Sequence, residues 1–394
     1  MTEITFLNNG IIVLTIEMLF LFVYNESGLQ KAVRYMLGFS VFLGEGLTAE
    51  KRRYIQEMKQ TGFTRIFTSL HIPEDDPQKV IETLQQLKKL TQKLQLDLMA
   101  DVSNTGLQRL AIDLTQPKAY QQLKKLGITG IRMDYGIDNQ TIAAVSHQMQ
   151  VGLNASTLTK KDVEELNTHQ ADFSKMELWH NYYPRPETGL SKDYLQSINY
   201  KWKALGFKIV AFVPGDENLR GPLYAGLPTL EEHRNCHPLA AAIDLVDHCG
   251  CDAVHIGDSG LSKKAQEQFH SYFKDKKMLL EVDLLSDSYL SLVLGEHTNR
   301  LDDARDVVRS QEARKNNQQT IEVETNYSRE QGSVTVDNKN YLRYMGEVQI
   351  TKYDLPADKK VNVVARVIKK DRALIDHIGP GCHFKLKERR GYIE

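Results

Sequence analysis

KMELWHNYYPRPETGL, residues 175–190, is the stretch from which the rest of the chain can be interpreted. Its first five residues alternate apolar and polar side chains as a short strand does, and its two prolines prevent that strand from continuing. Glu177, His180 and Asn181 therefore fall where a strand passes into a loop. Because loops on a rigid scaffold concentrate binding and catalytic groups, the stretch indicates a functional loop.

The same alternation of strand and connection repeats along the chain. Short β-rich runs are separated by longer helical patterns, which is typical of a parallel sheet with crossover helices. A doubly wound sheet would normally carry GxGxxG after its first strand, but Gly44-Glu45-Gly46 lacks the third glycine. Eight such pairs in about 240 residues match a (β/α)8 TIM barrel, so we predict the α/β class. The expected strands are 37–43, 65–70, 96–102, 130–134, 150–154, 175–179, 208–213 and 253–256, and the expected helices include 49–59, 78–95, 118–126, 161–168, 192–205, 239–248 and 263–274.

From about residue 278 the pattern changes to strands with few helical segments between them. We expect a small all-β domain over 276–394, after a barrel domain over 36–275. The polar span 296–319 is predicted to be either a surface helix or an exposed connection. The expected strands of this domain are 279–285, 321–323, 334–336, 342–353 and 360–367.

Residues 1–35 contain an apolar run over 10–24 that is interrupted by Glu17. The run is shorter than the ~20 residues of a spanning helix. A signal peptide would carry basic residues before the run, whereas the only charge there is Glu3. We expect no stable membrane insertion, and we expect the fold to begin near Met36.

Composition excludes some classes of function. The formal net charge is −1 and no basic block appears, so no nucleic-acid partner is expected. The four cysteines (Cys236, Cys249, Cys251 and Cys382) lack paired metal-ligand spacing. Few, scattered thiols suit a reducing cytoplasm.

Carboxylates follow three of the expected strands. Asp101, Asp134 and Glu177 come directly after apolar runs, in LMAD, IRMD and KME. Active sites of such barrels lie at the carboxyl ends of the strands, so these acids are expected at one mouth. Paired carboxylates are the minimum equipment for glycoside hydrolysis. The alternative is that single acids cap a helix or pair with a neighbouring arginine such as Arg132.

The same acids and the histidines suggest a metal site as an alternative. His71, His180, His233 and His237 could serve as ligands, but no HxH or HxxxH spacing supports this interpretation. We therefore predict neither a metal nor a cofactor.

The expected loop over 214–234 is rich in glycine and proline. Phosphate sites of these barrels commonly use the loops after strands seven and eight. Arg220 beside Gly221 is thus a candidate anion site, and Arg185, held between two prolines, is a second. A stiffened surface loop is the alternative. Trp179, Tyr182 and Tyr183 are candidates for stacking on a sugar.

Several long strings make the family resemblance specific. The chain resembles the bacterial 6-phospho-N-acetylmuramidases from about residue 36 to its end. The strings are FTSLHIPEDD (67–76), ADVS (100–103), RMDYG (132–136), LNAST (153–157), HNYYPRPETGLS (180–191), FVPGDENLRGPLYAGLPTLEEHR (212–234), VDNKNYLRYMGEVQI (336–350) and VNVVARV (361–367).

The resemblance implies a TIM barrel joined to a cyclophilin-like β-barrel. It also implies cytoplasmic cleavage of the β-1,4 bond of N-acetylmuramic acid 6-phosphate–N-acetylglucosamine during peptidoglycan recycling, so the expected partner is a phosphorylated amino-sugar disaccharide. We predict Asp134 and Glu177 as catalytic carboxylates, with Asp101 as the competing candidate. Alternative functions are a non-catalytic phosphosugar-binding protein or sensor, and a metal-dependent isomerase or aldolase. The expected substrate-binding residues are Glu45, His71, Asn154, His180, Asn181, Arg185, Arg220, Gly221 and Asp258.

Overall fold

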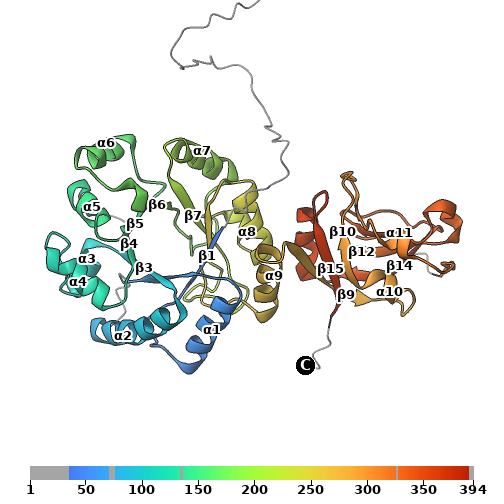
Figure 1. Cartoon of the computed structure of the whole chain (residues 1–394), viewed down its shortest axis with the longest axis horizontal. Coiled ribbons are helices and arrows are strands. Elements are labelled where there is room, and N and C mark those ends of the chain that lie inside the picture. The colour runs from blue at the N-terminus through green and yellow to red at the C-terminus, as the bar shows by residue number, and fades with distance from the viewer. Residues whose placement is uncertain (1–34, 71–75, 134–135, 325–326, 390–394) are drawn as a thin grey trace, which may run out of the picture. The chain divides into compact units, whose positions relative to one another are not determined.

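The computed structural model describes residues 35–70, 76–133, 136–324 and 327–389. Within them, eight parallel strands close into a barrel in the order β1 to β8, with β8 pairing back onto β1 (Figure 1). The predicted TIM barrel is confirmed. Its strands are β1 (Met36–Ser40), β2 (Arg65–Ser69), β3 (Asp97–Val102), β4 (Gly130–Met133), β5 (Gln150–Asn154), β6 (Met176–Trp179), β7 (Lys208–Val213) and β8 (Ala253–Ile256).

Helices surround the barrel strands (Figure 1). Many begin after a Ser, Thr or Asp side chain that accepts a hydrogen bond from an N–H of the first turn, which satisfies a donor that the helix leaves unpaired. The helices are α1 (Ala49–Gln60), α2 (Pro77–Leu94), α3 (Asn104–Arg109), α4 (Pro117–Lys125), α5 (Asn139–Ser146), α6 (Lys160–Thr168), α7 (Lys192–Lys203), α8 (Pro238–Asp247) and α9 (Lys263–Phe273), with 3-10 turns η1 (Phe173–Lys175) and η2 (Glu231–His233).

The inside of the barrel is closed by four rings, here called the aromatic layer: Phe67, Trp179, Phe212 and His255. Trp179 stacks on Phe67 with centroids 5.5 Å apart and lies 4.6 Å from the His255 ring. Phe212 packs edge-on against Phe67 at 5.1 Å. All four side chains are buried. The interior is therefore a packed core rather than a channel.

The second sheet has seven strands in the order β10-β15-β9-β14-β12-β13-β11. All of its pairings are antiparallel except that between β15 and β9. The expected all-β region is thus observed. Its elements are β9 (Lys277–Leu284), α10 (Leu290–Val293), β10 (Gly295–Thr298), β11 (Val307–Arg309), α11 (Ala313–Asn316), β12 (Ser333–Asp337), η3 (Lys339–Tyr344), β13 (Val348–Thr351), β14 (Val361–Val367), η4 (Lys369–His377) and β15 (His383–Glu388).

Three sequence predictions in this region are wrong. The span 296–319 is neither one surface helix nor a plain connection, because it contributes β10, β11 and α11. Residues 321–323 form no strand, although Ile321 is fully buried. The strand expected over 342–353 begins only at Val348, because η3 precedes it and Leu342 adopts φ 56° and ψ −117° there.

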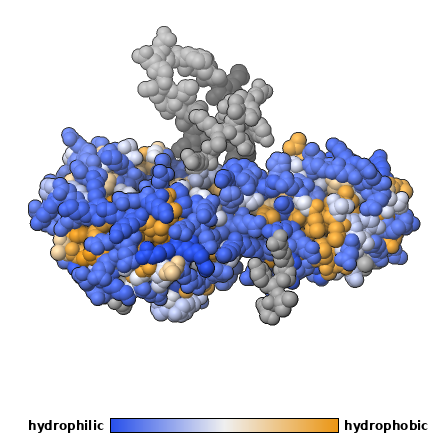
Figure 2. All heavy atoms as spheres, turned by 60° about the horizontal axis from the view of Figure 1, so that its bottom comes forward, coloured by the Kyte–Doolittle hydropathy of each residue, from blue (hydrophilic) through white to orange (hydrophobic). Residues whose placement is uncertain are grey.

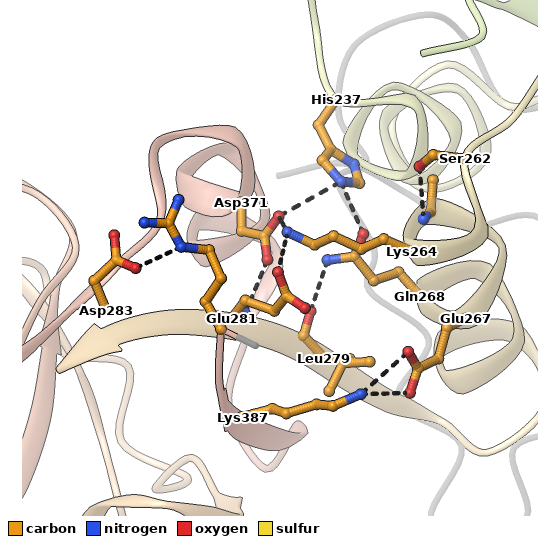
Figure 3. Close-up of polar contacts among 12 residues, drawn as sticks. His237, Ser262, Lys264, Glu267, Gln268, Leu279, Glu281, Asp283, Asp371 and Lys387 are labelled. Carbon is orange, nitrogen blue, oxygen red and sulfur yellow. Dashed lines mark hydrogen bonds and ion pairs between the residues drawn. The ribbon is translucent and has the colours of Figure 1, made fainter. Parts of the chain in front are cut away.

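A buried polar network joins the barrel helices to the second sheet (Figure 3). The carboxylate of Asp371 in η4 lies 2.6 Å from Lys264 Nζ of α9 and accepts a hydrogen bond of 2.9 Å from the Glu281 backbone N–H. His237, at the start of α8, lies 3.9 Å from Asp371 and contacts Gln268 at 3.0 Å. The Gln268 side chain in turn donates to the carbonyl of Leu279 in β9 at 3.1 Å. The barrel helices and the second sheet are thus joined by an ion pair and hydrogen bonds as well as by the chain.

The surface seen in Figure 2 is mostly hydrophilic, with hydrophobic residues in separate patches. No helix in the described ranges combines the length and apolar character of a membrane span.

Candidate active site

An acid and an arginine face each other on neighbouring strands near their carboxyl ends. Asp101 is the fifth of six residues in β3, and its register partner in β4 is Arg132. Arg132 Nη1 donates to Asp101 Oδ1 at 2.7 Å, and both side chains are buried. Arg132 Nη2 also donates to the side-chain oxygen of Asn181, beyond β6. A carboxylate is thus held near the mouth, and its arginine joins it to the β6 loop.

Tyr182 connects this pair to the loop after β7. Its ring packs edge-on against Phe212 at 5.2 Å, and its hydroxyl accepts a hydrogen bond of 3.0 Å from Arg220 Nη1. Burial raises the pKa of Tyr182; the charge of Arg220 opposes this rise and that of Asp101 adds to it. The phenol is therefore neutral at pH 7 and lies within electrostatic reach of both charged groups.

Arg220 is held in place but keeps its charge uncompensated. Its guanidinium lies over the Phe42 ring, 3.8 Å from the centroid. No carboxylate in the described part of the chain forms an ion pair with it. It lines a cavity of about 750 Å³ whose lining also carries four carboxylates, those of Glu45, Glu50, Glu57 and Glu217. Lys51 pairs with Glu45 at 3.0 Å, and Lys263 and Arg53 pair with Glu57 at 3.6 and 3.8 Å, so Arg220 is, among the described residues, the cation of this lining without a carboxylate partner. Such a group can bind an anion that enters the cavity.

Asp258 holds the loop after β7 in its conformation. Its fully buried carboxylate accepts backbone hydrogen bonds from Gly215, Arg220 and Leu227, at 2.9, 3.0 and 3.0 Å. Three donors from one loop fix its conformation. In the structure the Asp258 carboxylate anchors this loop, whereas from the sequence Asp258 is predicted to bind substrate.

Glu177 lies at a different depth from Asp101. It is the second of four residues in β6, and both of its oxygens face Arg65 at the start of β2, at 2.6 and 3.3 Å. Trp179, two residues further along the same strand, belongs to the aromatic layer. Alternation along β6 therefore places that layer between Glu177 and the carboxyl ends of the strands.

The polar residues expected around the substrate are spread over different environments. His180 is buried against α7, where its Nε2 lies 2.7 Å from the Asn199 side-chain oxygen, and burial lowers the pKa of His180 to about 4. Asn154, at the end of β5, accepts a hydrogen bond of 2.9 Å from the Ser156 N–H. Only Asn181 among these three contacts the Asp101–Arg132 pair through a described hydrogen bond.

The remaining predicted residues are exposed or lie outside the described part of the chain. Glu45 is exposed and pairs with Lys51 at 3.0 Å. The Arg185 side chain is exposed. His71 and Asp134 lie outside the described residues.

Two residues that the sequence analysis did not single out fasten the loops together, and we call Glu231 and Arg234 the loop clamp. The Glu231 carboxylate accepts two bonds of 2.6 Å from Arg234 and two from the backbone N–H groups of Glu187 and Gly189, at 2.8 and 2.7 Å. Arg234 also donates to the Arg185 carbonyl at 3.3 Å. Arg234 and these N–H groups lower the pKa of Glu231 to about 2. The E-x-x-R spacing is the only sequence signal for the pair.

Glu232, His233 and Asp244 offer ligand atoms within 4.8 Å of one another, a spacing that suits a metal ion. The Lys192 ammonium, however, lies 2.6 Å from Asp244 and 4.0 Å from Glu232. Its positive charge already compensates these carboxylates, so the cluster has an ion pair where a cation would sit.

The comparisons with known proteins cover most of the chain. Family models for the N-terminal and the C-terminal part of the 6-phospho-N-acetylmuramidases match residues 37–271 and 278–387. No protein with a curated description matches. A crystal structure of a conserved protein of unknown function from Enterococcus faecalis is 45% identical, with a TM-score of 0.83 over 90% of this chain and 96% of that one. An uncharacterized B. cereus protein is 26% identical, with a TM-score of 0.69 over 90% of this chain and 100% of that one.

Proposed function

Since the chain belongs to the 6-phospho-N-acetylmuramidase family, we propose that it is a glycoside hydrolase that cleaves the β-1,4 bond of N-acetylmuramic acid 6-phosphate–N-acetylglucosamine. The observation that carries the proposal is the connected series Asp101–Arg132 and Tyr182–Arg220. It offers a carboxylate for the glycosidic bond and an uncompensated cation for the 6-phosphate. A cytoplasmic role in peptidoglycan recycling, without a cofactor, belongs to the same proposal.

The proposed role of Asp101 in hydrolysis depends on its negative charge. Because it forms an ion pair with Arg132, it acts as a carboxylate, which can stabilise positive charge at the sugar carbon or orient the attacking group. Glycoside hydrolysis also needs a proton donor for the leaving oxygen. Asp134, which directly follows β4, is our proposed donor.

Arg220 would select for the phosphate. Its guanidinium offers paired donors that match phosphate oxygens, and Phe42 and Tyr182 hold it in place. Asn181 would bind a hydroxyl or acetamido group of the sugar. Glu177 remains a candidate acid by sequence, but we favour Asp101 because Arg65 engages both Glu177 oxygens beneath the aromatic layer.

Replacing Asp101 tests the catalytic assignment. Asp101→Asn should lower turnover of the phosphorylated disaccharide by about 10²-fold or more while substrate still binds, because the amide keeps the shape and removes the charge. Release of N-acetylglucosamine measures the rate. Asp97→Asn, at the exposed start of the same strand, is the matched control. Unchanged turnover in Asp101→Asn contradicts the assignment.

Replacing Arg220 tests the phosphate assignment separately. Arg220→Met should raise KM for the phosphorylated disaccharide and abolish its advantage over the unphosphorylated one, and Arg220→Lys should restore part of that advantage. Tight binding of the phosphorylated disaccharide by the wild-type protein, with no turnover, would instead identify a phosphosugar-binding protein or sensor.

A further inference from the structure

An exposed aromatic ring lies on the loop after β7. Tyr224 is 66% exposed, on a loop whose backbone is fastened by hydrogen bonds. The backbone N–H of Tyr224 donates to the Arg220 carbonyl at 3.2 Å. Asp258 fastens the chain on both sides of it, through the N–H groups of Arg220 and Leu227. The ring is therefore presented to solvent from a fixed position.

The ring of Tyr224 uses the space left by a glycine. A Cβ at Gly221 would lie 3.0 Å from both Cζ and Oη of Tyr224, so a larger residue at position 221 would push the ring away. From the sequence, Gly221 is predicted to allow close approach of an anion to the backbone. In the structure, its missing side chain instead lets Tyr224 approach. Tyr224 itself adopts φ 51°, a left-handed conformation that is costly for a residue with a side chain.

Tyr224 and Arg220 line the same cavity. An uncompensated guanidinium and an exposed aromatic ring, four residues apart on one fixed loop, match the two parts of a phosphorylated sugar: an anion and a ring with one apolar face. The three sequence candidates for stacking do not line this cavity. Trp179 is fully buried in the aromatic layer, Tyr182 packs edge-on against Phe67 and Phe212, and Tyr183 is half-buried.

We propose that Tyr224 is the stacking residue for the pyranose ring of a phosphorylated amino sugar whose phosphate binds Arg220. The identity of the sugar rests on the proposed function, whereas the division of labour between the two side chains rests on the cavity. Arg220 then contributes affinity for the phosphate, and Tyr224 contributes affinity for the sugar ring.

Calorimetric titration with two probes, N-acetylglucosamine 6-phosphate and inorganic phosphate, tests this division. Tyr224→Ala should weaken binding of the sugar phosphate about tenfold and leave binding of inorganic phosphate unchanged. Tyr224→Phe should bind both probes as the wild type does. Leu223→Ala is the matched control, because Leu223 is 52% exposed on the same loop and does not line the cavity. Thermal unfolding of each variant checks that it is folded.

Three results would overturn the inference: wild-type affinity for the sugar phosphate in Tyr224→Ala, equal loss of both probes in that variant, or no binding of either probe by the wild-type protein. The stacking proposal and the proposed function can fail independently of each other. Suppose that the wild-type protein hydrolyses no disaccharide, but that Tyr224→Ala loses affinity for the sugar phosphate and not for inorganic phosphate. That result would contradict the hydrolase proposal and support the stacking site.

Discussion

At the scale of single residues, packing inside the barrel constrains side chains in ways that no local sequence pattern predicts. His255 is fully buried, and neither ring nitrogen has a hydrogen-bond partner in the described part of the chain. Burial holds the pKa of His255 well below its usual value, so the ring is neutral. Gly38 on β1 makes room for it, because a Cβ there would lie 2.0 Å from His255 Nε2.

Adding a methyl group at this position should destabilise the barrel. Gly38→Ala is expected to lower the free energy of unfolding by about 2 kcal/mol or more, because the ring cannot move away in a packed core. Urea unfolding measures the change. The double variant Gly38→Ala/His255→Ala should recover part of the loss. Gly379→Ala, where a Cβ meets nothing within 4 Å, should change little, and an equal loss there would contradict the argument.

At the scale of elements, the sequence predicts where strands lie but not how far along a strand each side chain sits. LMAD and KME look alike, yet Asp101 is near the end of β3 whereas Glu177 is near the start of β6. The strand predicted over 175–179 already includes Trp179, but the sequence does not show that the Trp179 ring fills the barrel interior between Glu177 and the carboxyl ends of the strands. Burial of His180 against α7 depends on Asn199, which periodicity alone does not identify.

The loop clamp should give the protein a stability term that depends on pH. The pKa of Glu231 is lowered from 4.5 to about 2 in the folded state, so its contribution is fully present above pH 4.5 and is lost as the pH falls toward 2. Glu231→Gln should therefore be less stable than the wild type at neutral pH, and the difference should narrow over that acidic range.

Thermal unfolding between pH 7 and pH 3 measures this convergence. Glu232→Gln, the exposed neighbour, is the control and should follow the wild type. A gap for Glu231→Gln that stays constant with pH would contradict the role of the charge.

At the scale of the whole molecule, the barrel is the part that the sequence predicts best. Its strands alternate with helices that lie next to them in the chain, so local patterns suffice. The second sheet depends on distant pairings: β15 pairs with β9, and β11 is a three-residue strand with no alternating pattern to detect. The network around Asp371 cannot be predicted from local sequence patterns either, because it joins η4 to α9 and β9.

Removing one charge from this network should be costly (Figure 3). Lys264→Met leaves the fully buried Asp371 carboxylate without its ammonium partner, and we expect a loss of about 3 kcal/mol in the free energy of unfolding. The double variant Lys264→Met/Asp371→Leu should recover much of it. Lys387→Met, which breaks the exposed pair with Glu267, is the control and should cost less than about 1 kcal/mol.

The aromatic layer also determines what an optical measurement on this protein reports. The chain has two tryptophans: Trp179 lies in that layer, and Trp202 lies on α7 with its indole N–H bonded to the Ala155 carbonyl at 2.9 Å. Both are buried in the barrel, and the second sheet contains none. Intrinsic tryptophan emission is therefore a signal of the barrel alone, whereas circular dichroism sums over both sheets. Superimposing the two transitions distinguishes one cooperative unit from two.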